Sequence, residues 1–198
     1  MNRYIHIIAS GSSANAVLYF GKVLVDCGVN YKTIKPYLPE IDLILISHSH
    51  SDHCNEKTMN RIAFEYPNIT ILRTFKTNEV ISCRNIRVRA FHLYHDVSNF
   101  GFLIFSLEED RTVFHATDTA HLDGITASGF DYYCIETNYD EDKIDLIAAE
   151  QISRGEFSHA EGSKNSHLSL QQAQRFFNEN RGEHSVFIGL HKSDTYLD

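Results

Sequence analysis

The sequence lacks the features that mark membrane and secreted proteins. No window approaches 18 uninterrupted apolar residues, so we expect no membrane span. The segment 1–13 carries one early arginine and no apolar stretch of signal-peptide length. The four cysteines show no CxxC spacing, which favours reduced thiols over disulfides. These absences together predict a cytoplasmic protein with no membrane association.

An excess of positive charge is also missing. The net charge of −8 at pH 7 argues against a broadly basic surface for nucleic acids. A local binding surface stays open, because two divalent cations would add positive charge where a phosphate binds. Arg84, Arg87 and Arg89 cluster in "RNIRVRAFH". Since alternate residues of a strand point the same way, we interpret these arginines as a solvated strand face.

No repeat, low-complexity segment or linker divides the chain. With 198 residues, 42% of them hydrophobic and 22% charged, the composition is that of an ordinary globular protein. This length is enough for a sizeable core. We therefore predict a single domain spanning residues 1–198.

Short apolar runs dominate the chain, and they predict mostly strands. The expected strands cover 4–10, 16–20, 22–28, 41–47, 68–74, 79–83, 86–94, 100–108, 111–118, 130–137 and 184–190. Helical spacing predicts helices over 56–66, 140–153 and 169–182, the last with Ser169 as its N-cap and Gly182 just past its end. This order of strands and helices predicts an α+β fold, a four-layer αββα sandwich with two sheets inside and helices outside.

The stretch "ISHSHSDH" carries the strongest chemical signal. His48 and His50 lie two apart in an extended segment, so both side chains can point to one side. Asp52 and His53 follow at once and can turn to a second position. This HxHxDH pattern supplies two pairs of ligands for two adjacent cations. A polar loop that merely contains histidines is the alternative, but it leaves the crowding of mutually repelling imidazoles unexplained.

Further ligands are needed to complete two metal sites, and polar residues follow several strands. His95 is one candidate, with His92 as its competitor. Asp118 follows the apolar run of "VFHATD", and His191 follows the last strand. An aspartate between two cations can bridge them, and neutral imidazoles suit zinc, manganese or iron.

HxHxDH with a later histidine, an aspartate and a C-terminal histidine, each after a strand, resembles the metallo-β-lactamase superfamily. Within it the chain is most similar to the small single-domain WalJ (YycJ) type, described as metal-dependent 5′-to-3′ DNA exonucleases. The resembling pieces are "ASGSSAN", "LVDCG", "ISHSHSDH", "YHDVSNFGF", "TDTAHL", "IETNYD", "SHLS" and "GLHKSD". The match covers nearly the whole chain.

The resemblance implies a division of the metal ligands. One metal would take His48, His50 and His95, the other would take Asp52, His53 and His191, and Asp118 would bridge both. Asp26 in "LVDCG" matches an aspartate that holds the metal-binding loop in place without binding metal. The alternative for Asp26 is a turn residue before Gly28.

The resemblance also implies residues that act on the substrate. Asp52 would orient the attacking hydroxide as well as bind metal. His167 in "NSHLS" would contact a substrate phosphate or protonate the leaving group, and the alternative is a helix-capping polar residue. Ser12 and Ser13 in "GSSAN" are candidates for contacts with the substrate. Tyr139 departs from the pattern, since related proteins commonly carry histidine there.

The implied activity is that of a dinuclear metal-dependent phosphodiesterase, a DNA exonuclease in which a metal-bridging hydroxide attacks phosphorus in line. Its cofactors would be two divalent ions, zinc or manganese, with iron as a further candidate. No obligate protein partner is expected. Four alternatives remain: hydrolysis of small phosphodiesters such as cyclic nucleotides, thioester or lactam hydrolysis, redox chemistry on a di-iron site, and a binding role without catalysis.

Overall fold

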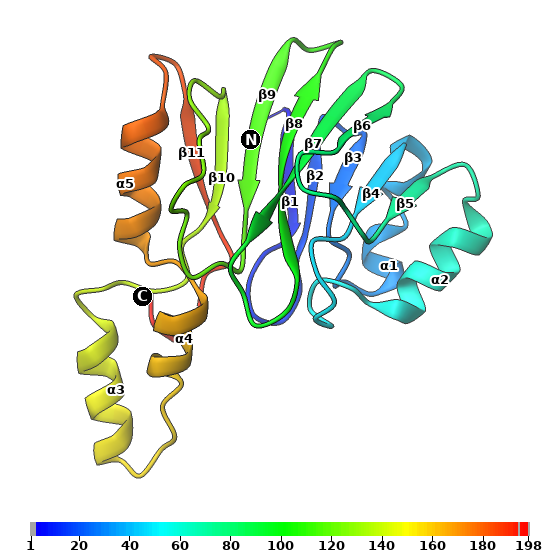
Figure 1. The fold of residues 1–198 in the computed structure, drawn as a ribbon. Helices are drawn as coiled ribbons and strands as arrows, with labels where there is room; N and C mark the ends of the chain where they lie inside the picture. Colours follow the sequence, from blue (N-terminus) through cyan, green and yellow to red (C-terminus); the bar gives the residue numbers. More distant parts are fainter. Residues whose placement is uncertain (1–2, 194, 198) are drawn as a thin grey trace.

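The computed structural model describes residues 3–193 and 195–197, so Asp194 of the "GLHKSD" piece lies outside the described residues. Two β-sheets form its centre (Figure 1). The first sheet runs in the order β1 (Ile5–Ala9), β2 (Ala16–Tyr19), β3 (Val23–Val25), β4 (Leu43–Leu45) and β5 (Thr70–Leu72). The second runs in the order β11 (Val186–Leu190), β10 (Tyr132–Glu136), β9 (Arg111–Ala116), β8 (Asn99–Ser106), β7 (Ile86–Leu93) and β6 (Val80–Cys83).

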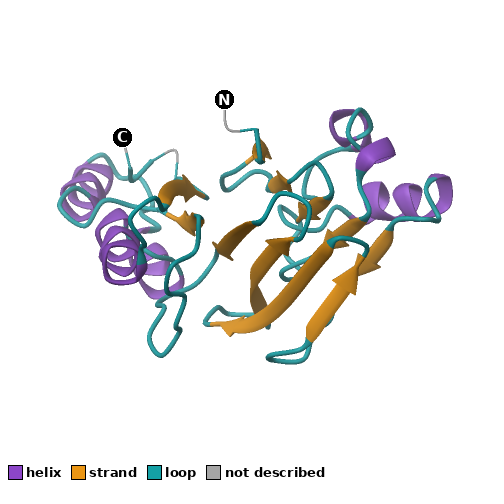
Figure 2. Ribbon diagram, turned by 90° about the horizontal axis from the view of Figure 1, so that it is seen from above, coloured by secondary structure: helices purple, strands orange, loops and turns teal. Residues whose placement is uncertain are grey.

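The two sheets pack face to face through their apolar side chains. Val17 and Val25 of the first sheet belong to the same buried cluster as Val88, Ile104 and Val113 of the second. Helices cover the outer faces, and seen from above they flank the strands on both sides (Figure 2). The result is the predicted four-layer αββα sandwich, because each sheet buries one face against the other and one against helices.

The helices follow from the sequence to different degrees. The outer layers contain α1 (Tyr31–Ile34), the 3₁₀ turn Leu38–Glu40 and α2 (Glu56–Glu65) on the first sheet, and α5 (Leu170–Asn180) on the second. The predicted helices correspond to α2, α3 (Ile144–Ser153) and α5. The sequence did not predict α1 or α4 (Ala160–Ser166). No helix among the described residues is long and apolar enough to cross a membrane.

The caps of α5 confirm both predicted ends of this helix. Ser169 accepts a hydrogen bond from the Gln172 backbone N–H, and the Gln172 side chain accepts one from Ser169 N–H, so the N-cap prediction is confirmed. The helix ends at Asn180 with Arg181 as its C-cap, so Gly182 lies just past the end, as predicted. Arg181 is extended, which turns the chain directly toward β11.

One edge of the sandwich collects the ends of most strands. Strands β3, β4 and β5 are mutually parallel, as are β9, β10 and β11. Strands β1 and β7 also run in these directions, because each is separated from its parallel neighbour by one antiparallel strand. The segments that follow these strands therefore meet at the same edge, the lower one in Figure 1. The segments that carry the predicted metal ligands follow β4, β7, β9 and β11 and leave their strands here.

Gly28 lets the HxHxDH loop pack against the first sheet. Cys27 N–H donates to the His53 carbonyl (2.8 Å) and Gly28 N–H donates to Asn15 (2.9 Å), so three segments share backbone hydrogen bonds. A Cβ atom at Gly28 would lie 1.7 Å from the carbonyl oxygen of Asp52. No side chain fits in that space, so the close approach of the Asp52 backbone requires glycine at position 28 of "LVDCG".

Gly28→Ala should therefore displace the loop and destabilise the protein by about 3 kcal/mol or more. The matched control is Gly162→Ala in α4, where an added Cβ meets nothing within 4 Å. That change should leave stability unchanged or raise it by about 0.5–1 kcal/mol. Thermal unfolding of both variants measures the difference. Equal melting temperatures for Gly28→Ala and the wild type would show that the close approach is not required.

Candidate metal centre

The HxHxDH loop leaves β4 and folds into a single compact turn. His53 N–H and Cys54 N–H both donate to the carbonyl of His50, at 3.0 and 2.8 Å. This turn brings Asp52 and His53 back over the start of the loop. The spacing of the motif therefore gives two separate directions for its side chains, as the sequence predicted.

His48, His50 and His95 form the first group that suits a metal. One ring nitrogen from each lies within 4.8 Å of the others. The rings of His48 and His50 both lie 5.2 Å from that of His95, centroid to centroid. His95 follows β7 and His48 follows β4, so this group joins the two sheets.

Asp52, His53 and His191 form the second group, again with ligand atoms within 4.8 Å of one another. Asp52 Oδ2 lies 3.3 Å from His53 Nε2 and 3.7 Å from His191 Nε2. His53 and His191 are buried, whereas the Asp52 side chain is 24% exposed.

Asp118 lies between the two groups. Its Oδ2 lies 2.8 Å from His53 Nε2, and its Oδ1 lies 3.3 Å from His191 Nε2. It also shares a possible metal group with His48 and His53. Asp118 Oδ2 and His191 Nε2 are both buried with no hydrogen-bond partner. Buried polar atoms without a hydrogen bond are costly, and a cation held between them would satisfy them.

Hydrogen bonds at the far side of the rings hold several histidines in one orientation. His53 Nδ1 donates to Asp26 Oδ2 (2.7 Å), and His95 Nδ1 donates to the carbonyl of Ser166 (3.2 Å). In this tautomer each ring turns an unprotonated Nε2 toward the centre. Metal-binding histidines in proteins usually have such a partner on the second nitrogen.

Asp26 lies directly beneath the loop. Its carboxylate accepts hydrogen bonds from Ser47 N–H (2.7 Å) and Ser47 Oγ (2.9 Å), and it contacts His53 as described above. Asp26 is buried at 2% exposure and has a positive φ of 62°. Asp118 and His191 also have positive φ, 55° and 47°. Such strained backbone at non-glycine residues is typical of functional sites, where the surrounding structure enforces it.

The electrostatics of the centre favour bound positive charge. Burial lowers the pKa of His48 to about 4, which keeps this imidazole neutral and able to bind metal. Burial would also lower the pKa of His191, but the Asp118 carboxylate outweighs it and raises that pKa to about 10. Burial would raise the pKa of Asp118, but His191 and His53 hold it well below its usual range. The residues present therefore fit a pair of divalent cations.

The family of the chain follows from comparison with known proteins. A model of the beta-lactamase superfamily domain matches residues 21–129, more than half of the chain. The chain belongs to the beta-lactamase superfamily. YhfI from Bacillus subtilis, a metallo-beta-lactamase fold protein, superimposes with a TM-score of 0.70 at 16% identity, over 96% of this chain and 85% of that one. The resemblance seen in the sequence and the predicted fold are both confirmed.

Two proteins with similar sequences have names that specify an activity. Exodeoxyribonuclease YycJ of Bacillus anthracis is 27% identical over 177 residues, which cover 73% of this chain and 66% of the relative. Exodeoxyribonuclease WalJ of Streptococcus pneumoniae is 30% identical over 168 residues, which cover 68% of this chain and 62% of the relative. The chain thus spans less than two thirds of the length of these relatives.

The fold also brings two residues to the metal centre that the sequence analysis did not single out. Glu136, at the end of β10, is fully buried and lies 2.5 Å from His167 Nδ1 and 3.2 Å from His191 Nδ1. Asn15 Nδ2 contacts His53 Nε2 (2.8 Å) and Asp52 Oδ2 (3.2 Å). A signal for Glu136 was present, because a carboxylate directly after the apolar run "DYYCI" needs a partner when buried.

His167 lies against the same centre. Its Nδ1 is 3.3 Å from Asp118 Oδ1, and its side chain is 19% exposed. Burial would lower its pKa, but the Glu136 carboxylate outweighs this and raises it. Asp118, Glu136, His167 and His191 also satisfy the distances of a metal group, so a role for His167 as a ligand is a geometric alternative to contact with substrate.

The remaining predicted residues lie further out. Ser12 and Ser13 are exposed, and Asn15 is the member of their loop that contacts the centre. His92 is exposed and packs on the ring of Phe100 instead of joining either metal group. Tyr139 is buried in an apolar cluster with Ile144, Ala160 and Tyr196.

Proposed function

We propose that the chain is a dinuclear metal-dependent phosphodiesterase that acts as a DNA exonuclease. The observation that carries this proposal is the pair of three-residue groups with Asp118 between them. Two adjacent cations suit in-line displacement at phosphorus, since one can stabilise the attacking oxygen and the other the leaving oxygen. The exodeoxyribonuclease names of the relatives support DNA as the substrate.

The chain supplies the ligands and the residues that position the reactants. Two bound divalent cations, zinc or manganese, would polarise the phosphoryl oxygen and lower the pKa of water. Asp52 is the partly exposed member of the second group and would orient the attacking water. Its carboxylate stays ionised: burial alone would raise its pKa, but contacts from His191 and His53 hold that pKa far below its usual range.

His167 would act as the general acid that protonates the leaving group. Glu136 holds its Nδ1 and leaves Nε2 free to face the substrate. The raised pKa of His167 keeps the protonated form available, so this residue would give a proton to the departing oxygen.

The four cysteines suit a cytoplasmic location. All are free, including Cys27 and Cys54, which lie opposite each other in a β-bridge. Adjacent thiols that stay reduced fit a reducing compartment.

A metal-reconstituted substrate panel tests the proposed function. After saturation with zinc or manganese, elemental analysis should find two ions per chain, and end-labelled single-stranded DNA should be shortened from one end. Cyclic nucleotides, a thioester and a lactam complete the panel. At most one ion per chain in every metal would refute the dinuclear centre. Turnover of a cyclic nucleotide without cleavage of any nucleic acid would favour the small-substrate alternative, which the net charge of −8 also suits.

A further inference from the structure

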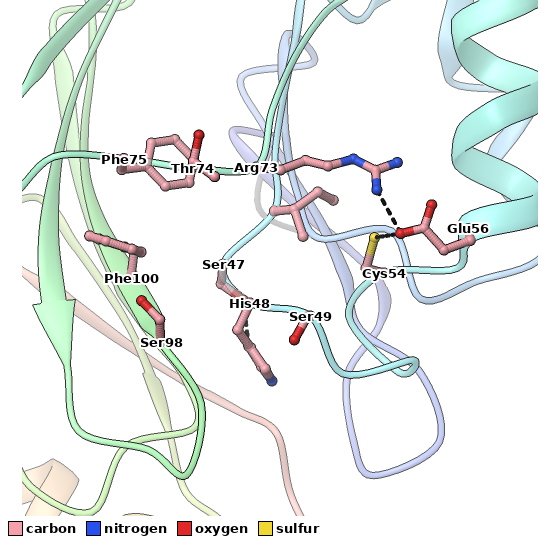
Figure 3. Close-up of a pocket in the computed structure, with 11 residues that line it drawn as sticks. Ser47, His48, Ser49, Cys54, Glu56, Arg73, Thr74, Phe75, Ser98 and Phe100 are labelled. Atoms are coloured by element: carbon pink, nitrogen blue, oxygen red, sulfur yellow. Dashed lines mark hydrogen bonds and ion pairs between the residues drawn. The ribbon is translucent and has the colours of Figure 1, made fainter.

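A pocket of about 390 Å³ opens beside the first metal group. His48 and Ser49 of the HxHxDH loop form part of its wall, so the pocket adjoins the metal centre (Figure 3). Its volume lies within the range of pockets that hold small organic molecules. No residue of this wall other than His48 has a role in the proposed function.

Four chain segments build the pocket, and they come from both sheets. Residues 46–49 follow β4, Cys54 and Glu56 lie at the start of α2, residues 73–75 follow β5, and Ser98 and Phe100 lie at the start of β8. Phe100 N–H donates to the carbonyl of Ser47 (3.2 Å), which ties the sheets together at this point. The pocket is therefore part of the rigid scaffold that holds the metal ligands.

One side of the pocket is aromatic. The rings of Phe75 and Phe100 meet edge to face, with centroids 5.4 Å apart. Phe75 is buried, and behind it Phe102 continues the cluster at 5.1 Å, whereas Phe100 is half-buried. Phe100 thus offers ring surface to the pocket from a fixed position.

The opposite side carries a cation. Arg73 Nη1 donates to Glu56 Oε1 (2.6 Å), and the Arg73 side chain is 39% exposed (Figure 3). Glu56 is the sole hydrogen-bond partner of this guanidinium among residues 3–193 and 195–197, so most of its five donors remain free. Thr74 and Ser98 add hydroxyl groups to the pocket lining.

We propose that this pocket binds the base of the nucleotide next to the scissile phosphate, and that Arg73 contacts the following phosphate. An aromatic wall suits a base, because every base has a flat face that stacks regardless of sequence. A guanidinium at the rim suits a phosphate, which it binds in a planar, two-pronged geometry. The inference rests on the proposed function, since the position beside His48 places a base here only when a phosphodiester lies on the metals.

Binding of thymidine 5′-monophosphate to the zinc-loaded protein tests the site for the base. The matched ligand is 2-deoxyribose 5-phosphate, which has the same phosphate and no base. Calorimetry should find the nucleotide bound at least about fivefold more tightly, as expected when one base stacks on an aromatic ring. Phe100→Leu should remove most of this preference. The control is Phe105→Leu, a half-buried phenylalanine toward the far end of the same strand. Equal binding of the two ligands to the wild type would overturn the proposal.

Cleavage of an end-labelled oligonucleotide tests the contact with the following phosphate. Arg73→Ala should raise KM by about fivefold or more and leave kcat nearly unchanged, because Arg73 lies away from the reacting atoms. The control is Arg61→Ala, which breaks an arginine–glutamate pair of the same 2.6 Å length on α2, outside the pocket. An unchanged KM in Arg73→Ala, or an equal rise in Arg61→Ala, would overturn the role of Arg73.

The two proposals fail in different experiments. If the wild type cleaves DNA but binds the nucleotide no better than the sugar phosphate, the pocket proposal falls and the exonuclease stands. If the nucleotide binds with the expected preference and no nucleic acid is cleaved, the site for the base stands and the exonuclease falls.

Discussion

Replacing His95 with alanine should remove one metal ion per chain and lower turnover on the order of a thousandfold. His95 supplies the only ligand of the first group that comes from the second sheet, and its side chain is 4% exposed. Without it the other cation has no partner to share the charge that develops on oxygen, a loss of several kcal/mol. Elemental analysis and steady-state turnover of the reconstituted variant measure both effects.

The matched control is His92→Ala, three residues earlier on β7. His92 is exposed and contacts Phe100, so this variant should keep both metals and most activity. If His92→Ala loses a metal ion while His95→Ala keeps both ions and its activity, then His92 is the third ligand of the first group in place of His95.

Replacing His167 with alanine should lower turnover by about 10²–10⁴-fold while both metals stay bound, the range expected for loss of a general acid. Glu136→Gln keeps an acceptor for His167 Nδ1 and should cost less than His167→Ala, because the ring remains held in place. His184→Ala is a control, since His184 is exposed and lies just before β11.

Metal content decides between the two roles of His167 that the geometry allows. If His167→Ala retains two ions but loses turnover, the residue acts on the substrate. Loss of an ion would instead make His167 a ligand in the group with Asp118, Glu136 and His191. Full activity with full metal content would exclude both roles and leave His167 as the C-cap residue of α4.

The sequence predicted elements well where the physical signal is local. Continuous apolar runs such as 41–47 give strands because a strand buried on both faces needs apolar residues throughout. The prediction failed for α4, whose sequence "AEGSKNS" contains glycine, serines and asparagine, all weak helix formers. This helix forms in the context of the fold, where Ala160 packs with Tyr139, Ile144 and Tyr196.

The candidate site divides in the same way. The four ligands of the HxHxDH loop are close in sequence, so their spacing alone indicates two pairs of ligands for two adjacent cations: His48 with His50, and Asp52 with His53. The later members His95, Asp118 and His191 could be named because each follows a strand, and the carboxyl ends of parallel strands share an edge. Ser166 left no signal, because its contact with His95 is made by a backbone carbonyl that every residue type carries.

What the sequence by itself determined is the kind of chemistry: an HxHxDH loop after a buried strand, followed by polar residues at later strand ends, is specific enough to indicate a two-metal centre. Tertiary structure alone decided which groups support that centre. Asn15 reaches it from the loop between β1 and β2 and Glu136 from the end of β10, and the pocket beside His48 is lined by both Arg73 and Phe100. These residues are far apart along the chain, and only the packing of one sheet on the other fixes the distances between them.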